Sequence, residues 1–80
     1  MNIAIVGGGN AAVTILNHFS LFDSHQVIGI ADLNADAPGV IRAQELEIDT
    51  TDDMMVLVRH PKTEIVFELT GNEKVQSIIK

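Results

Sequence analysis

The stretch N-I-A-I-V-G-G-G-N-A-A, residues 2–12, changes character twice along its length. An apolar run ends at Val6, three glycines follow, and apolar residues then return with helical spacing. A short continuous apolar run is typical of a strand that is covered on both faces, as in parallel sheets. The stretch therefore predicts a strand, a tight turn and the start of a helix.

The glycines of this stretch fit the pattern G-x-G-x-x-G/A at Gly7, Gly9 and Ala12. In dinucleotide-binding turns, the first position allows a sharp exit from the strand, the second lets the backbone approach a pyrophosphate, and the third keeps the helix close to the sheet. The N–H groups of the helix start, at Asn10 and Ala11, are expected to face the phosphates. Glycine turns between a strand and a helix are also common without any ligand, so a second feature is needed.

Asp32 supplies that second feature, because it closes the apolar run Gln26–Ala31 and follows Ala12 by 20 residues. At this separation a carboxylate at the tip of the second strand reaches the adenosine ribose. It can accept hydrogen bonds from both ribose hydroxyls and would repel a 2′-phosphate, so NAD is expected in preference to NADP. Leu33 is expected beside it at the cofactor. The alternative is that residues 32–34 are only a polar turn.

The remainder of the chain alternates between predicted strands and helices. Strands are expected at Asn2–Val6, Val27–Ala31, Ile48–Thr50 and Glu64–Thr70. Helices are expected from Asn10 to about Ser20, from Asp36-Ala37-Pro38 to about Leu46, from Asp52 or Asp53 to His60-Pro61, and from Glu73 to Lys80. Short connections imply right-handed crossovers and a parallel sheet. The prediction is an α/β domain with a partial, doubly wound sheet in the order 3-2-1-4 and helices on both faces.

Three local features refine this prediction. The first helix has an apolar stripe that should be buried, formed by Ala12, Ile15, Leu16 and Phe19. Asp36 is expected to accept from free amides at the start of the second helix, with Pro38 in its first turn. Gly29 within the second strand is expected to mark the close approach of a neighbouring helix.

Composition limits the classes of function. The chain has 80 residues, a net charge of −6 and no cysteine, which argues against a nucleic-acid surface and excludes disulfides and thiolate metal sites. No apolar run approaches the ~20 residues of a membrane span, and the first strand begins at the initiator Met, so a cytoplasmic chain without a membrane partner is expected. Two groups of polar residues are assigned no metal or catalytic site: the histidines, expected to be solvated, and an acidic cluster of Glu45, Glu47, Asp49, Asp52 and Asp53.

Three segments carry a family resemblance: I-A-I-V-G-G-G-N-A-A, V-I-G-I-A-D and H-P-K-T-E-I-V-F-E-L-T-G-N. They resemble the amino-terminal NAD(P)-binding Rossmann domain of the glucose-fructose oxidoreductase and inositol dehydrogenase family, and that of homoserine and aspartate dehydrogenases. The resemblance implies that Asp32 binds the ribose and that Thr70, Gly71 and Asn72 line the cofactor after the fourth strand. It also implies that residues 1–80 form a single truncated domain, with the catalytic lysine or histidine of these families beyond it.

The G-G-G run also resembles the FAD sites of flavoproteins, but those usually carry glutamate where this chain has Asp32, so FAD is not expected. Three functions remain open. The leading one is the NAD-binding portion of an oxidoreductase, inactive alone. The others are a non-enzymatic, ligand-sensing domain of a larger signalling protein, and a structural remnant with an empty crevice.

Assembly is predicted from the fourth strand, Glu64–Thr70, which should lie at an open edge of the sheet. Such an edge invites pairing with a second copy, and a homodimer is therefore expected. The alternative is a monomer in which the last helix shields the sheet.

Overall fold

Four parallel strands form the centre of the molecule, in a computed structural model that describes residues 1–21 and 24–70. The strands are β1 (Asn2–Val6), β2 (Gln26–Ala31), β3 (Thr50–Thr51) and β4 (Ile65–Glu68), in the order β3-β2-β1-β4. The helices of this part are α1 (Asn10–Phe19), α2 (Pro38–Glu45) and α3 (Met54–Val58). The predicted α/β class, parallel sheet and strand order are confirmed. The predicted turn at Gly71 and Asn72 and the predicted helix from Glu73 lie outside the described residues.

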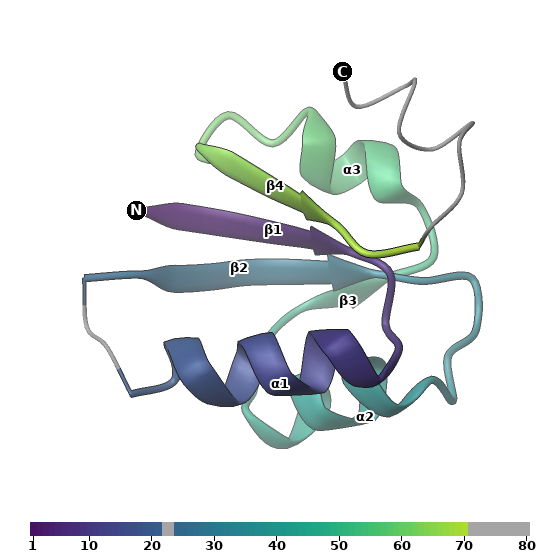
Figure 1. The fold of residues 1–80 in the computed structure, drawn as a ribbon. Helices are drawn as coiled ribbons and strands as arrows, with labels where there is room; N and C mark the ends of the chain where they lie inside the picture. Colours follow the sequence, from purple (N-terminus) through teal and green to yellow (C-terminus); the bar gives the residue numbers. More distant parts are fainter. Residues whose placement is uncertain (22–23, 71–80) are drawn as a thin grey trace.

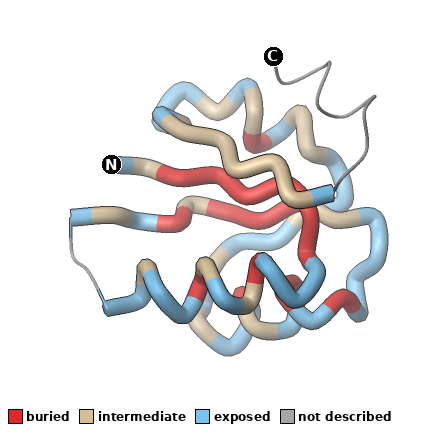
Figure 2. The backbone as a smooth tube through the Cα atoms, in the orientation of Figure 1, coloured by how far each residue is buried: buried red, intermediate tan, exposed pale blue. Residues whose placement is uncertain are grey.

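The helices cover both faces of the sheet, with α1 and α2 on one side and α3 on the other (Figure 1). The larger core lies under α1 and α2 and contains Ile3, Ile5, Leu16 and Ile30, each at most 1% exposed. The predicted stripe of α1 is confirmed, because Ala12 and Leu16 are buried and Ile15 and Phe19 pack against this core. Figure 2 shows that burial follows β1 and most of β2 and alternates along the helices.

Strand β2 contains a bulge. Ile3 of β1 pairs with Val27 and the next residue, Ala4, pairs with Gly29, so that Ile28 is an extra residue in β2. A bulge breaks the strict alternation of faces along a strand. As a result, Val27 and Ile30 belong to the same core under α1 and α2 although three positions separate them.

The side of the sheet that α3 covers depends on Gly29. A Cβ built on Gly29 would lie 2.5 Å from Cδ2 of Leu57, the buried residue of α3. The predicted close approach of a helix to Gly29 is therefore confirmed. Helix α3 begins after Asp53, whose carboxylate accepts the N–H of Met55 at 3.0 Å as an N-cap.

The start of α2 differs from the prediction. Ala37 is the N-cap residue and no side chain caps the helix, so the expected capping role of Asp36 is wrong, whereas Pro38 does occupy the first turn. The backbone N–H of Asp36 instead donates to Oδ1 of Asn34 in a local turn, which directs the chain into the helix.

Strand β3 is shorter and later than predicted, because Thr50–Thr51 replaces the expected Ile48–Thr50. The N–H of Ile48 donates to the carbonyl of Ala43 at 2.8 Å, which holds this residue at the end of α2. Glu47, just before it, has a φ of 60°. Pairing with β2 therefore begins only where Thr50 lies beside Ile30.

Strand β4 lies at one edge of the described sheet and spans Ile65–Glu68, which is shorter than the predicted Glu64–Thr70. All four of its residues are partly exposed. No helix of the described ranges 1–21 and 24–70 is long and apolar enough to cross a membrane.

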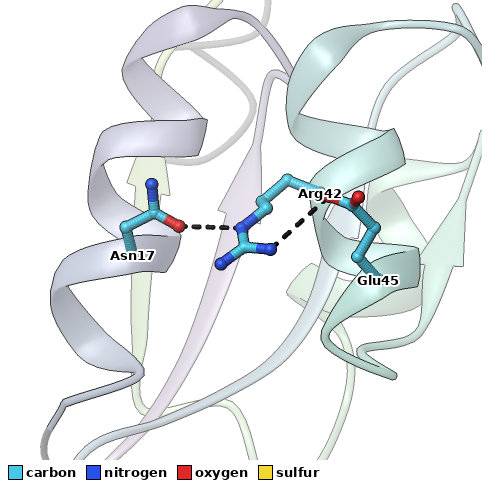
Figure 3. A network of polar contacts seen from close by, with 3 residues as sticks. All are labelled: Asn17, Arg42 and Glu45. Atoms are coloured by element: carbon cyan, nitrogen blue, oxygen red, sulfur yellow. Dashed lines mark hydrogen bonds and ion pairs between the residues drawn. The ribbon is translucent and has the colours of Figure 1, made fainter.

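A polar network joins α1 and α2 on their outer side (Figure 3). Nε of Arg42 donates to Oδ1 of Asn17 at 2.8 Å, and the Arg42 guanidinium lies 3.5 Å from the Glu45 carboxylate. Exposed ion pairs contribute little free energy. The network therefore helps to set the rotation of α2 against α1, while the stability of the pair comes from the core beneath.

Helix α2 makes its closest approach to the glycine loop at Gly39. A Cβ there would lie 2.8 Å from Cβ of Ala12 and 2.8 Å from the carbonyl oxygen of Gly8. Helix propensity alone would favour alanine at Gly39 by up to ~1 kcal/mol. We expect Gly39→Ala instead to destabilise the protein by about 1–3 kcal/mol through overpacking, measured by urea unfolding.

The control for Gly39→Ala is Gln44→Ala, which replaces an exposed residue of the same helix and should be nearly neutral. A Gly39→Ala protein as stable as the parent would mean that α2 does not pack this closely against the loop.

Candidate functional site

The turn after β1 strongly favours glycine at position 7. Gly7 has a φ of 107°, and its N–H donates to the carbonyl of Ala31 at 2.8 Å, so the end of β1 is tied to the end of β2. A Cβ on Gly7 would lie 2.9 Å from the carbonyl carbon of Leu69. Both the backbone angle and the lack of space disfavour a side chain there. This agrees with the role predicted for the first glycine.

Asp32 is held against the glycine loop by two backbone amides. The N–H of Gly8 donates to its Oδ2 at 2.6 Å, and the N–H of Asn34 donates to its Oδ1 at 2.8 Å. Each carboxylate oxygen keeps a further lone pair with which it can accept from a ligand hydroxyl. The spacing argument from the sequence therefore placed Asp32 correctly beside the loop, in a fixed orientation and only partly buried.

Gly8 lines the candidate cleft, although the sequence pattern did not assign it. A Cβ at this position would lie 3.0 Å from Cγ2 of Val40 and 3.1 Å from Oδ2 of Asp32. Its carbonyl accepts the N–H of Gly39 at 2.6 Å. Gly8 thus joins the loop to Asp32 on one side and to α2 on the other. The G-G-G run was the available signal, but the pattern treats its middle position as variable.

Ala12 also lies in this packing, fully buried and close to Gly39. Ala12 lies in the core below the loop, and its small side chain allows α1 to pack closely against α2. The sequence pattern predicted a need for close packing here and gave the sheet as its partner.

The start of α1 is open to solvent. Gly9 is the N-cap residue, and no side chain caps the helix. A Cβ built on Gly9 would meet nothing within 4 Å. Asn10 and Ala11 are exposed in the first turn. A helix start of this kind presents backbone N–H groups and the positive end of the helix dipole to an anion.

A cleft of about 440 Å³ lies at the carboxyl ends of the strands, between the glycine loop, Asp32 and the end of β4. Of the predicted site residues, Gly7, Gly9, Asp32, Leu33 and Thr70 line it. The lining residues that sequence reasoning did not assign are Val6, Gly8, Ala31, Asp52, Met54 and Leu69. Gly71 and Asn72, also predicted here, lie outside the described residues.

The polar character of the cleft comes from Asp32, Asp52 and Thr70. Thr70 donates to Oε1 of Glu68 through its N–H, at 2.6 Å, and also through its hydroxyl. Asp52 was grouped with an acidic cluster and assigned no site, yet it shares this cleft with Asp32. The described residues contain no group of three or more histidine or carboxylate side chains placed to hold a metal ion.

Comparison with protein families, curated proteins and solved structures finds no match to this chain. The resemblance to the NAD(P)-binding domains named above therefore remains a prediction from the sequence.

The two outer glycines of the loop should respond differently to alanine. Gly7→Ala places a side chain at positive φ and against the backbone, so we expect a loss of about 1–3 kcal/mol in unfolding free energy. Gly9→Ala should cost much less, because φ is −76° and the space is open. Urea unfolding of the two variants provides a matched comparison. Equal losses would contradict this assignment of the loop geometry.

Proposed function

We propose that this protein is the NAD-binding domain of an oxidoreductase-like protein and binds the dinucleotide in the cleft at the carboxyl ends of its strands. The observation that carries the proposal is the hydrogen bond from Gly8 N–H to Asp32, which fixes a carboxylate beside an open, uncapped helix start. In doubly wound folds, ligands bind in this crevice outside the strand ends.

Each part of the cleft suits a part of the dinucleotide. The open space at Gly9 suits the pyrophosphate, and the backbone N–H groups of the first turn, at Asn10 and Ala11, follow directly although these two residues do not line the cleft. The remaining lone pairs of Asp32 suit the two ribose hydroxyls. The exposed side chain of Leu33, at the lip of the cleft, offers an apolar surface for the adenine ring.

The charge of the cleft favours NAD over NADP. Asp32 and Asp52 line the same cleft, and the described lining includes neither arginine nor lysine. A 2′-phosphate placed beside Asp32 would therefore meet like charge and lack a cationic partner. FAD is disfavoured by the aspartate at position 32, where flavoproteins usually carry glutamate, and by the order of elements after the second strand.

We expect Asp32→Ala to weaken NAD binding by about tenfold or more, because hydrogen bonds to a charged group contribute about 1.5–3 kcal/mol. Asp32→Ser combined with Leu33→Arg should shift preference towards NADP, by removing repulsion and adding a phosphate partner. Calorimetric titration with NAD, NADP, FAD and AMP measures both effects.

The control for Asp32→Ala is Asp36→Ala, which removes an exposed carboxylate outside the cleft and should leave NAD affinity unchanged. Gly9→Val should hinder both NAD and NADP by filling the space where the pyrophosphate approaches. Nucleotide affinities unaltered in the Asp32 and Gly9 variants would exclude this loop as the site.

The regulatory alternative uses the same cleft. A sensing domain would bind NAD or another small nucleotide here and pass the result to a neighbouring domain. The calorimetric series helps to separate the sensor from the dinucleotide-binding domain. Equal affinities for AMP and NAD would favour a nucleotide sensor. A higher affinity for NAD than for AMP would favour a dinucleotide-binding domain, because the nicotinamide half then contributes to binding.

We also propose that two copies of the chain pair through β4. This strand is the edge of the described sheet, and three of its residues, Ile65, Val66 and Phe67, are apolar and only partly buried. Antiparallel pairing of two β4 strands across a two-fold axis would satisfy edge N–H and C=O groups and enlarge a small core.

Sedimentation equilibrium at micromolar concentration should therefore show a dimer, and Val66→Lys should shift it to monomer by placing charge at the joint. Val56→Lys is the matched control, since Val56 is an exposed residue of α3 and the dimer should survive this change. Circular dichroism checks that both variants are folded. A monomeric parent protein would exclude pairing through this edge.

A further inference from the structure

A second cavity, of about 720 Å³, lies at the opposite end of the sheet from the proposed NAD cleft. It is bordered by the first residues of β1 and β2, by the end of α1, and by the segments that follow α2 and α3. Its volume falls within the ~300–1,000 Å³ of typical small-molecule sites. Nothing in the proposed NAD binding uses these residues.

The cavity exists because β3 is short. This strand pairs with β2 only at Ile30 and Ala31, so the amino half of β2 is without a strand on that side in the described part of the chain. The chain between α2 and β3 turns aside at Glu47, which has a φ of 60°. This positive φ ends α2 in a common way, with the N–H groups of Glu47 and Ile48 donating to the carbonyls of Gln44 and Ala43. Glu47 lies at the lip of the cavity.

His25 forms part of the cavity wall. Its Nδ1 is buried and has no hydrogen-bond partner among the described residues, although the ring lines the cavity. The ring packs edge-on against Phe19, with centroids 5.5 Å apart. The sequence predicted a solvated histidine here. Because Nδ1 is enclosed by the protein, a ligand in the cavity would meet other atoms of this ring.

Groups of both charges surround the cavity. His60 Nδ1 accepts the backbone N–H of Lys62 at 3.0 Å, so the proton of the neutral ring lies on Nε2, which is then a donor. The Lys62 ammonium forms no ion pair with the carboxylates of the described residues. Glu47 and Asp49 line the same cavity from the segment after α2, and they also lack ion pairs within residues 1–21 and 24–70.

The rest of the lining is mixed. Apolar walls come from the core side of the sheet, with Leu16, Phe19, Leu46 and Ile48 among them, and polar walls come from Asn2, Ser20 and Gln26. A simple anion would be repelled by the carboxylates of Glu47 and Asp49, and a simple cation would be repelled by the ammonium of Lys62. A molecule that carries both charges on one end and an apolar group on the other fits all three surfaces.

We propose that this cavity binds a small zwitterion with an apolar side chain, a free α-amino acid of the leucine or phenylalanine kind. Its carboxylate pairs with Lys62 and the His60 Nε2–H, its ammonium with Glu47 and Asp49, and its side chain packs against the apolar wall. The site is independent of NAD binding, so either proposal can fail without the other.

Calorimetric titration of the whole chain with L-leucine and L-phenylalanine tests the proposal. Two derivatives of leucine each remove one charge: N-acetyl-L-leucine loses the ammonium, and L-leucinamide loses the carboxylate. We expect saturable binding of at least one amino acid and an affinity about tenfold lower for both derivatives, because each loses a charge-assisted contact. Absence of saturable binding, or equal affinity for either derivative, would overturn the proposal.

Variants locate the binding. Lys62→Met should lower the affinity for the amino acid by about tenfold and leave the affinity for NAD unchanged. Arg59→Met is the matched control, since Arg59 is an exposed cation just after α3 that does not line the cavity. Equal losses in the two variants would show a general charge effect and contradict the assignment of Lys62.

Discussion

Close backbone packing at Gly7, Gly8 and Gly39 is the constraint on which the rest of this structure depends. At each of these positions a Cβ would lie within 3.0 Å of atoms in a neighbouring segment. Because these three glycines have no Cβ, the end of β1, the end of β4 and the start of α2 can meet around one loop. The Gly8 amide then reaches Asp32, and the cleft forms beside that bond. The fold and the candidate site therefore share one packing requirement, and substitutions in it affect both.

Sequence reasoning predicted the parts of the molecule that are determined by local pattern and by chain topology. The apolar run up to Val6 and the glycines after it specify a strand and a sharp turn. Short crossovers of fixed hand then leave few possible strand orders, and the observed order is the expected one. The position of Asp32 beside the loop follows from the same topology, because parallel strands end at one edge of the sheet.

The features that were not predicted depend on competing local hydrogen bonds or on surroundings that several elements supply. Ile48 is β-branched and apolar, so it suggests a strand, but its N–H is already taken by the carbonyl of Ala43. Asp36 suits an N-cap, but the local turn at Asn34 uses that part of the backbone. Asp52 and His25 belong to cavities whose walls come from several elements, and no sequence spacing indicates such surroundings.

The bulge at Ile28 has a consequence for comparing this chain with others. The spacing between Ala12 and Asp32 includes this extra residue, so a protein with a regular second strand would reach the equivalent carboxylate one residue sooner. An alignment that permits gaps only in loops would then either pair Asp32 with its neighbour or assign each residue of β2 before the bulge to the wrong face. Recognition of distant relatives through this strand requires a gap inside it, at the position of Ile28.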